Sequence, residues 1–169
     1  YKTFVFETEA PIDECDPVAC VTAPSLECNV PTLVNTCDGC SSPICQTYRN
    51  GCGDGDRAGT GPQKFFRIDV PATGNYTFDI ASADTNGDAQ FSVFTDCVLP
   101  RTSCVLAQDQ NYWAQNPTGP RWTETGTASL DAGTYFLHVS QANSTCGDIN
   151  VLVSCEVAPC LPPDSVTIK

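Results

Sequence analysis

Three oxygen-bearing side chains occur at alternate positions in the segment ADTNGDA. Asp84, Asn86 and Asp88 have the spacing with which a tight loop presents several oxygens to one Ca²⁺ ion. Ala89 and Thr95 stand where a helix–loop–helix calcium hand carries Gly and Glu, which excludes that motif. Because Asp, Asn and Gly are also turn formers between strands, the segment predicts either a Ca²⁺ site or a plain connection.

Aromatic and amide side chains gather in the long polar segment from Asp109 to Glu124. Tyr112, Trp113 and Trp122 offer flat apolar faces beside hydrogen-bonding amides, a combination typical of a platform for pyranose rings. The alternative interpretation is that these aromatics pack under the loop and anchor it to the domain. The segment therefore makes an extracellular polysaccharide a candidate ligand.

Catalytic motifs are absent from the sequence. The one histidine, His138, stands between Phe136 and Ser140 in a β-prone segment, and a Ser-His-Asp arrangement would need partners brought to it by the fold. The chain has no G-x-S-x-G, H-E-x-x-H or phosphate-binding glycine loop, and no carboxylate pair stands out. We therefore expect a protein that is not an enzyme and has no cofactor other than the candidate Ca²⁺.

Charge and hydropathy restrict the partners. Eight Lys and Arg residues against 20 Asp and Glu residues give a formal net charge of -12, which disfavours nucleic acid and anionic membranes. No apolar run approaches the ~18–20 residues that a membrane-spanning helix needs. The chain opens at Tyr1 without a basic and then apolar leader, so we expect a mature form.

The cysteine content indicates an oxidising compartment. Twelve cysteines in 169 residues are typical of a secreted protein, extracellular or at the cell surface, that is rich in disulfides. The cysteines expected in bridges are Cys15, Cys20, Cys28, Cys37, Cys40, Cys45, Cys52, Cys97, Cys104, Cys146, Cys155 and Cys160. The first seven form an odd group, so at least one bridge joins this group to the rest if all are paired. Cys97 and Cys104 are near enough in sequence for a short-loop bridge.

Alternation of apolar and polar residues predicts strands from residue 61 onward. Phe66, Ile68 and Val70 share one face of a strand at residues 65–70, and a turn leads to a second alternating run at 76–80, which together predict a hairpin. Further strands are expected at residues 32–34, 90–94, 127–130, 134–140 and 148–153. No 3.6-residue period is sustained. The predicted fold is all-β, an antiparallel and jelly-roll-like β-sandwich with a cysteine-rich N-terminal extension.

The order FFRIDVPATGNYTFDI, then SCVLAQD, then ASLDAGTYFLHVSQANSTCGDINVLVSC resembles the bacterial pre-peptidase C-terminal (PPC) domain family over about residues 63–155. The most specific part is LDAGTYFLHV at residues 130–139, a hairpin signature. The resemblance implies a β-sandwich of the kind appended to secreted enzymes, with roles in secretion, substrate attachment or calcium-supported binding. It implies no catalytic residue.

Four segments follow from these patterns. We expect an N-terminal extended strand at residues 1–12, a cysteine-rich extension at 13–60, the sandwich at 61–160 and a C-terminal tail at 161–169. Residues 1–9 form a β-prone run without Gly or Pro, in which Phe4 and Phe6 share one face and Val5 lies on the other. Such a strand can complete its own sandwich or pair with the open edge of another copy and build a filament.

The sequence thus predicts a structural or adhesive subunit whose main partner is a copy of itself, joined through Phe4, Val5 and Phe6. The alternative is a carbohydrate-binding module of a secreted hydrolase. Asn75 and Asn143 begin N-glycosylation sequons, which are relevant in a glycosylating source.

Overall fold

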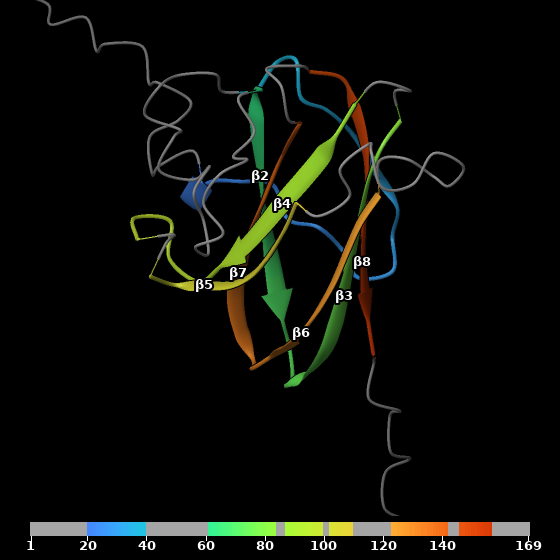
Figure 1. Cartoon of the computed structure of the whole chain (residues 1–169). Helices are drawn as coiled ribbons and strands as arrows, with labels where there is room; N and C mark the ends of the chain where they lie inside the picture. Colours follow the sequence, from blue (N-terminus) through green and yellow to red (C-terminus); the bar gives the residue numbers. More distant parts are fainter. Residues whose placement is uncertain are drawn as a thin grey trace, which may run out of the picture.

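The computed structural model describes residues 20–39, 61–83, 87–99, 102–109, 123–141 and 146–156. Eight β-strands follow one another along these segments (Figure 1). They are β1 (Thr32–Asn35), β2 (Gln63–Val70), β3 (Gly74–Ser82), β4 (Ala89–Phe94), β5 (Cys104–Gln108), β6 (Thr123–Leu130), β7 (Gly133–Gln141) and β8 (Asp148–Cys155). Within this part of the chain, no helix has the length and apolar character to cross a membrane.

Inward-facing side chains of the strands fill the space between two sheets. On β2, the residues Phe66, Ile68 and Val70 are buried on the inner face, as their alternation predicts. Phe78 of β3 and Phe91 of β4 stack from opposite sheets, with ring centroids 5.9 Å apart. The other buried members of this core are Val34, Tyr76, Ile80, Ala89, Val93, Leu130, Tyr135, Leu137, Val139, Ile149, Val151 and Val153.

The described strands form two four-stranded antiparallel sheets. Sheet I has the order β1-β8-β3-β6, and sheet II has the order β2-β7-β4-β5. The pairs β3–β6, β2–β7 and β1–β8 are nested about the β4–β5 hairpin, so the chain winds around the core as one long folded hairpin. This is a jelly-roll arrangement, and the predicted all-β, jelly-roll-like sandwich is confirmed.

Two predicted hairpins are instead crossings between the sheets. β2 pairs with β7 in sheet II, whereas β3 pairs with β6 and β8 in sheet I, so the hairpin predicted for residues 65–70 and 76–80 is wrong. The hairpin signature at residues 130–139 likewise spans β6 and β7, which lie in different sheets. A three-residue connection such as 71–73 can span about 10 Å, the distance between packed sheets. Alternation fixes which face of a strand is buried but not which strand it pairs with.

Within the described residues, three disulfides fasten the N-terminal segment to the sandwich. They join Cys20 to Cys97, Cys28 to Cys155 and Cys37 to Cys146, across sequence separations of 77, 127 and 109 residues. The expectation that at least one bridge joins the first cysteine group to the rest is confirmed. The predicted short-loop bridge between Cys97 and Cys104 is wrong, because Cys97 is buried against Cys20, beside Phe65 and Phe94. Cys104 is disulfide-bonded as well.

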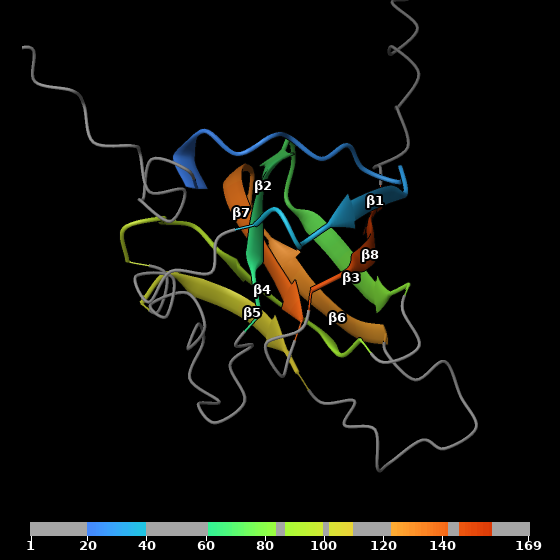
Figure 2. The same ribbon diagram turned by 90° about the horizontal axis from the view of Figure 1, so that it is seen from above.

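A segment that we call the strap, residues 23–31, crosses one side of the sandwich. The Arg67 carbonyl in β2 accepts a hydrogen bond from the Leu26 N–H at 2.8 Å. Further along, the Asn29 N–H donates to the Val153 carbonyl of β8 at 2.8 Å, and the chain then enters β1 on the edge of sheet I. The strap therefore passes from the edge of sheet II to the edge of sheet I, as the blue segment in Figure 2 shows.

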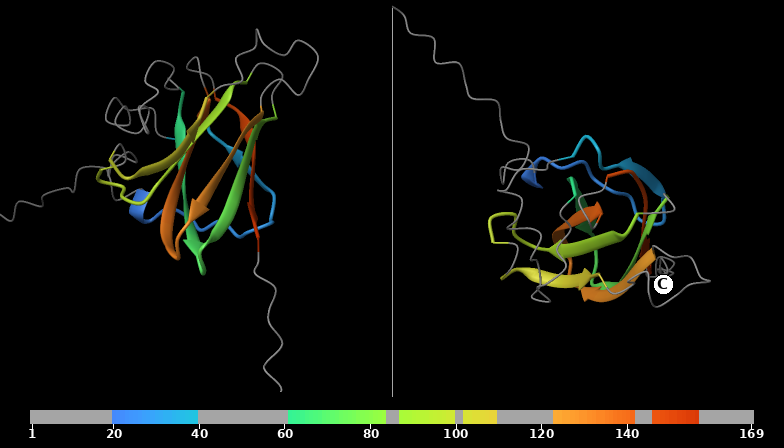
Figure 3. Two further views of the ribbon diagram at one scale, coloured as in Figure 1. Left: turned by 60° about the horizontal axis from the view of Figure 1, so that its bottom comes forward. Right: turned by 45° about the horizontal axis from the view of Figure 1, so that its top comes forward.

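The opposite side of the sandwich is closed by direct contact between strands. β5 and β6 are the edge strands of sheets II and I, they contact each other, and they lie across the molecule from the strap (Figure 3). Gly126 on β6 permits this approach, since a Cβ there would lie 2.9 Å from Gln108 Cγ and 3.1 Å from Leu106 Cδ2. The two sides of the sandwich therefore differ in what closes them.

Candidate functional site

Three carboxylates from different strand ends meet at one end of the sandwich. Asp88 precedes β4, Asp109 follows β5, and Glu124 is the second residue of β6. One carboxylate oxygen of each residue lies within 4.8 Å of the others. Asp88 is 7% exposed and Glu124 is 2% exposed, while Asp109 is half-buried. We call these three residues the acidic cluster.

The acidic cluster has the donor set of a hard-cation site. Carboxylates that are buried together need compensation by hydrogen bonds or by positive charge, because burial and mutual repulsion both disfavour the ionised forms. A Ca²⁺ ion supplies two positive charges and takes about 6–8 oxygen ligands, many of them carboxylates. Zinc in structural sites prefers nitrogen and sulfur ligands. An all-oxygen cluster therefore fits calcium better than zinc.

Glu124 was not predicted as a site residue because β6 begins earlier in the chain than the sequence indicated. The predicted strand began at residue 127, which left Glu124 in the preceding loop, whereas β6 begins at Thr123. In the observed strand, Glu124 occupies an inward position on the same face as Gly126 and Leu130. A carboxylate on an otherwise apolar strand face is a signal that could have identified it. Asp109 carried no such signal.

The predicted calcium loop is described only in part. Of its three residues the structure describes Asp88, while Asp84 and Asn86 lie outside the described residues. The acidic neighbours of Asp88 are Asp109 and Glu124, which are distant in sequence. Coordination by Asp84 and Asn86 stays a prediction, and the acidic cluster adds a separate set of oxygens around Asp88.

The candidate sugar platform also lies outside the described residues. Tyr112, Trp113 and Trp122 belong to the segment that connects β5 to β6. The structure does describe the two ends of that segment, because Asp109 and Glu124 both belong to the acidic cluster. A cation bound there would hold the two ends of the aromatic segment together.

Other predicted residues lie outside the described part of the chain. They are Phe4, Val5 and Phe6 of the self-assembly segment, Asn143 of the second sequon, and the cysteines Cys15, Cys40, Cys45, Cys52 and Cys160. Asn75 of the first sequon is described, and it is exposed at the start of β3. Its glycosylation stays a prediction.

His138 is part of a buried layer on the outer face of sheet II. It is 3% exposed, its ring centroid lies 5.4 Å from that of Phe65, and its Nδ1 lies 3.4 Å from the Ser92 hydroxyl. Ser92 is itself 4% exposed. Because both side chains are shielded from solvent, the Ser92–His138 pair does not have the access that a nucleophile and its base require.

A groove opens where the strap leaves the edge of sheet II. It encloses about 580 Å³ between the strap, β1 and the start of β2, a volume typical of ligand pockets. Phe66 and Val34 of the core contribute to its lining. Leu33 and Val30 line it as well and remain 63% and 45% exposed. The groove therefore presents apolar surface to solvent on the strap side of the sandwich.

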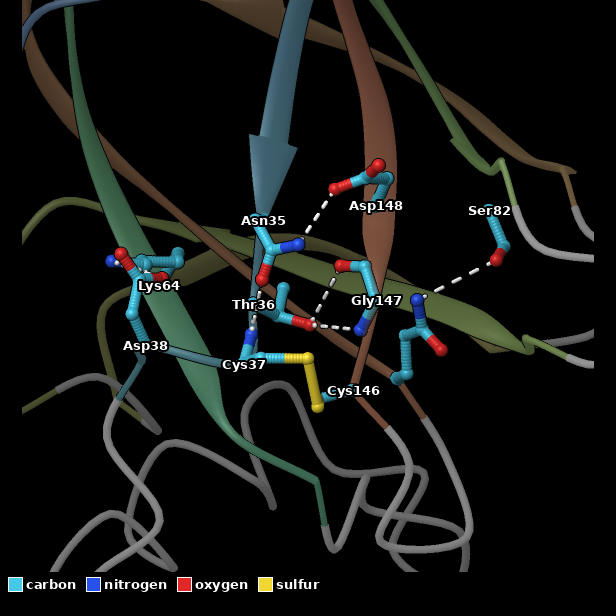
Figure 4. Close-up of a disulfide and its surroundings, with 10 residues drawn as sticks. Asn35, Thr36, Cys37, Asp38, Lys64, Ser82, Cys146, Gly147 and Asp148 are labelled. Carbon is cyan, nitrogen blue, oxygen red and sulfur yellow. Dashed lines mark hydrogen bonds and ion pairs between the residues drawn. A yellow bond between two sulfur atoms is a disulfide. The ribbon is translucent and has the colours of Figure 1, made fainter.

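One end of the groove carries an ion pair. Lys64 Nζ lies 2.9 Å from Asp38 Oδ1, and the hydrogen bond from Lys64 lowers the pKa of the Asp38 carboxyl below its ordinary value. This end is braced by the Cys37–Cys146 disulfide, next to which the Thr36 hydroxyl and the Gly147 N–H lie 3.1 Å apart (Figure 4). The charged end of the groove is therefore held in place by covalent and hydrogen bonds.

No family model and no curated protein matches this chain. Among solved structures, it is similar to the pre-peptidase C-terminal domain of a collagenase from Bacillus anthracis, with a TM-score of 0.50 and 11% identity, over 78% of this chain and 94% of that domain. It also matches the K1 cleaved adhesin domain of Lys-gingipain from Porphyromonas gingivalis, with a TM-score of 0.40 and 16% identity, over 75% of this chain and 73% of that one. A C-terminal CBM6 of a laminarinase from Zobellia galactanivorans matches with a TM-score of 0.35 and 17% identity, over 73% and 99% of the two chains.

The chain is thus a disulfide-braced β-sandwich, with two four-stranded sheets in the part that the structure describes. Its fold is similar to that of the pre-peptidase C-terminal domain, as the residues at 63–155 predicted. At 11% identity this likeness concerns the fold alone.

Proposed function

We propose that this protein is a secreted, non-catalytic structural subunit that assembles with copies of itself by donating its N-terminal strand, residues 1–9. The observation that carries the proposal is the difference between the two sides of the sandwich. β5 and β6 contact each other on one side, whereas the strap spans the other and leaves a groove beside β2. The strap hydrogen-bonds to β2 at Arg67, and the groove beside Lys64 and Phe66 presents apolar surface that a donated strand would cover.

The N-terminal segment has the properties of a donated strand. The run YKTFVFETE is β-prone and precedes every cysteine of the chain. The three disulfides support an extracellular setting, since they are typical of oxidising compartments, and they brace the acceptor against unfolding. A strand donated to the next copy makes a head-to-tail contact, which need not close into a ring and so yields a filament.

Electron microscopy of the full chain, with light scattering on the same sample, tests this proposal. We expect filaments from the unmodified chain and their loss from the Phe4→Asp/Phe6→Asp double variant. Thr3→Ser is the matched control, because it changes the opposite face of the same strand without adding charge. Particles of about 18 kDa from the unmodified chain would contradict self-assembly.

A second candidate function is carbohydrate binding by Tyr112, Trp113 and Trp122. The observation that favours it is that both ends of their segment, Asp109 and Glu124, belong to the acidic cluster, so a bound cation would restrain the loop. A glycan array tests it with the unmodified chain and Trp113→Ala. Binding that is lost in the variant supports the module, and an array without signal argues against it.

We also propose that the acidic cluster binds Ca²⁺ through Asp88, Asp109 and Glu124. The support is their burial and mutual distance, together with the all-oxygen donor set. Asp84 and Asn86 remain candidate ligands from the loop before Asp88. The role of such an ion is structural, since it would link the ends of β4, β5 and β6.

A further inference from the structure

We infer that the groove between the strap and β2 is the acceptor for residues Phe4 and Phe6 of a second copy of this chain. The inference rests on the proposed strand donation and identifies where the donated strand binds. The donated strand is recognised through its side chains in this groove, and not by pairing with any other edge of the two sheets.

The lining of the groove matches an apolar donor face. Its described surface includes Leu26, Val30 and Leu33 on the strap and β1, opposite Phe66 on β2. Leu33 is 63% exposed, although it lies on a strand that pairs with β8. Covering a large exposed apolar side chain with another apolar group lowers the free energy, because apolar surface is removed from water.

The spacing of the donor side chains suits the dimensions of the groove. Phe4 and Phe6 are two residues apart, so on an extended strand they project from the same face about 7 Å apart. The groove encloses about 580 Å³ and continues from Pro24 on the strap to Asp38 after β1. It therefore has room for two neighbouring aromatic side chains, each of which buries about 150–250 Å² when covered.

Charge in the groove also suits the donor. Lys2 shares the face of Phe4 and Phe6, and it is one of 8 basic residues in a chain with a net charge of -12. The lining of the groove includes the acidic residues Glu27 and Asp38, of which Asp38 is paired with Lys64. Glu27 is therefore the lining carboxylate that Lys2 of the donor would meet.

Residues 1–9 of the same chain are the alternative occupant of the groove. Ten residues separate Glu9 from Cys20, two of them proline, and Cys20 is bonded to Cys97. Crosslinking between differently labelled chains distinguishes the two occupants.

Photo-crosslinking in the full-length chain tests the inference. Phe6 is replaced by the photoreactive benzoyl-phenylalanine in chains grown with either ¹⁴N or ¹⁵N, the two are mixed before assembly, and the crosslinked peptides are identified by mass spectrometry. We expect crosslinks to peptides that contain residues 24–35 or 64–66, in pairs that combine both labels. Crosslinks to β5 or β6 in filaments would show that the groove is not the acceptor, while strand donation itself would still stand. Crosslinks confined to one label would place the strand in its own groove and overturn the inference.

A pair of matched variants gives an independent readout. Leu33→Glu puts a carboxylate into the groove, and Val105→Glu puts one on β5, on the other side of the sandwich. Both residues are exposed on edge strands, by 63% and 44%, so both variants should keep their melting temperatures. We expect Leu33→Glu to raise the protein concentration needed for assembly by roughly tenfold or more, since a charge would be buried against an aromatic ring. Equal effects of the two variants on assembly would overturn the assignment of the groove as the acceptor. A chain that never assembles would overturn strand donation itself.

Discussion

Tyr76 and Tyr135 make the same hydrogen bond at two equivalent crossings between the sheets. Each hydroxyl donates to the carbonyl oxygen four residues earlier, Tyr76 to Ala72 at 3.2 Å and Tyr135 to Asp131 at 3.1 Å. Both rings are buried at the ends of the core. The two crossings are also joined to each other, since the Thr73 hydroxyl donates to Asp131 Oδ1 at 3.2 Å. Each tyrosine thereby fixes the turn that carries the chain from one sheet to the other.

Removing either hydroxyl should destabilise the sandwich. We expect Tyr76→Phe and Tyr135→Phe each to lower the free energy of unfolding by about 0.5–1.5 kcal/mol, because a partly buried carbonyl loses its donor. Chemical denaturation followed by tryptophan fluorescence measures the change. Thr77→Val is the control, as its hydroxyl meets that of Thr127 on the exposed face and its loss should cost less. Equal losses in all three variants would argue against a special role of the crossings.

Gly126 and Gly74 should respond differently to the addition of a methyl group. At Gly126 a Cβ would lie 2.9 Å from Gln108 Cγ and 3.1 Å from Leu106 Cδ2, so Gly126→Ala should push β5 away from β6 and cost about 1–3 kcal/mol. At Gly74 the nearest atom would lie 3.7 Å away, on the Tyr76 ring, so Gly74→Ala should be close to neutral. Thermal unfolding of the two variants side by side checks this. Similar melting temperatures would mean that the β5–β6 side is more adaptable than its packing indicates.

Calcium should stabilise the folded chain through the acidic cluster. We expect the melting temperature to rise with added Ca²⁺ and to fall with a chelator, since an ion that binds only the folded state shifts the unfolding equilibrium. Glu124→Gln should abolish this dependence. The effect should also weaken as the pH is lowered, because protons compete with the cation for the carboxylates.

A matched control distinguishes Ca²⁺ binding by the acidic cluster from a general effect of removing one carboxylate. Asp79→Asn removes a carboxylate from the outer face of sheet I, where Asp79 accepts a hydrogen bond from Thr125 at 2.7 Å. This variant should keep its response to Ca²⁺. Calorimetric titration without heat of binding in the unmodified chain would rule out the calcium proposal.

The bridge between Cys28 and Cys155 should contribute strongly to stability. It closes a sequence separation of 127 residues, and Asn29 beside it accepts a hydrogen bond from the Cys155 N–H at 3.2 Å. We expect the Cys28→Ser/Cys155→Ser double variant to lose about 2–5 kcal/mol of unfolding free energy. Denaturant titration of this variant and of the unmodified chain measures the loss. An unchanged midpoint would show that Asn29 and the strap hold this end of β8 without the bridge.

Prediction from the sequence succeeded where local patterns carry the information. The inward residues of β2 follow directly from the alternation at Phe66, Ile68 and Val70, because side chains of a strand point to opposite faces in turn. The first cysteine group has an odd number of members, seven, which required a bridge to the other group if all are paired, and Cys37–Cys146 is one such bridge. Which cysteines pair could not be derived, since the twelve allow many connectivities.

The acidic cluster was missed for a related reason. Asp88, Asp109 and Glu124 are separated by 21 and 15 residues, and only the nesting of β4, β5 and β6 brings their oxygens together. The local spacing of Asp84, Asn86 and Asp88 predicted a Ca²⁺ site with different partners for Asp88, and the structure adds oxygens from distant strands to its surroundings.

The sequence by itself determined that this protein is an all-β, disulfide-rich sandwich, because alternation, turn residues and cysteine content are properties of the chain read locally. The tertiary structure alone decided which edges pair. β2 joins β7 and not β3, and the strap lies beside Arg67 so that a groove opens next to Lys64 and Phe66. The physical reason is that a strand offers two equivalent hydrogen-bonding edges, and the choice between them is made by burial against residues far away in the chain.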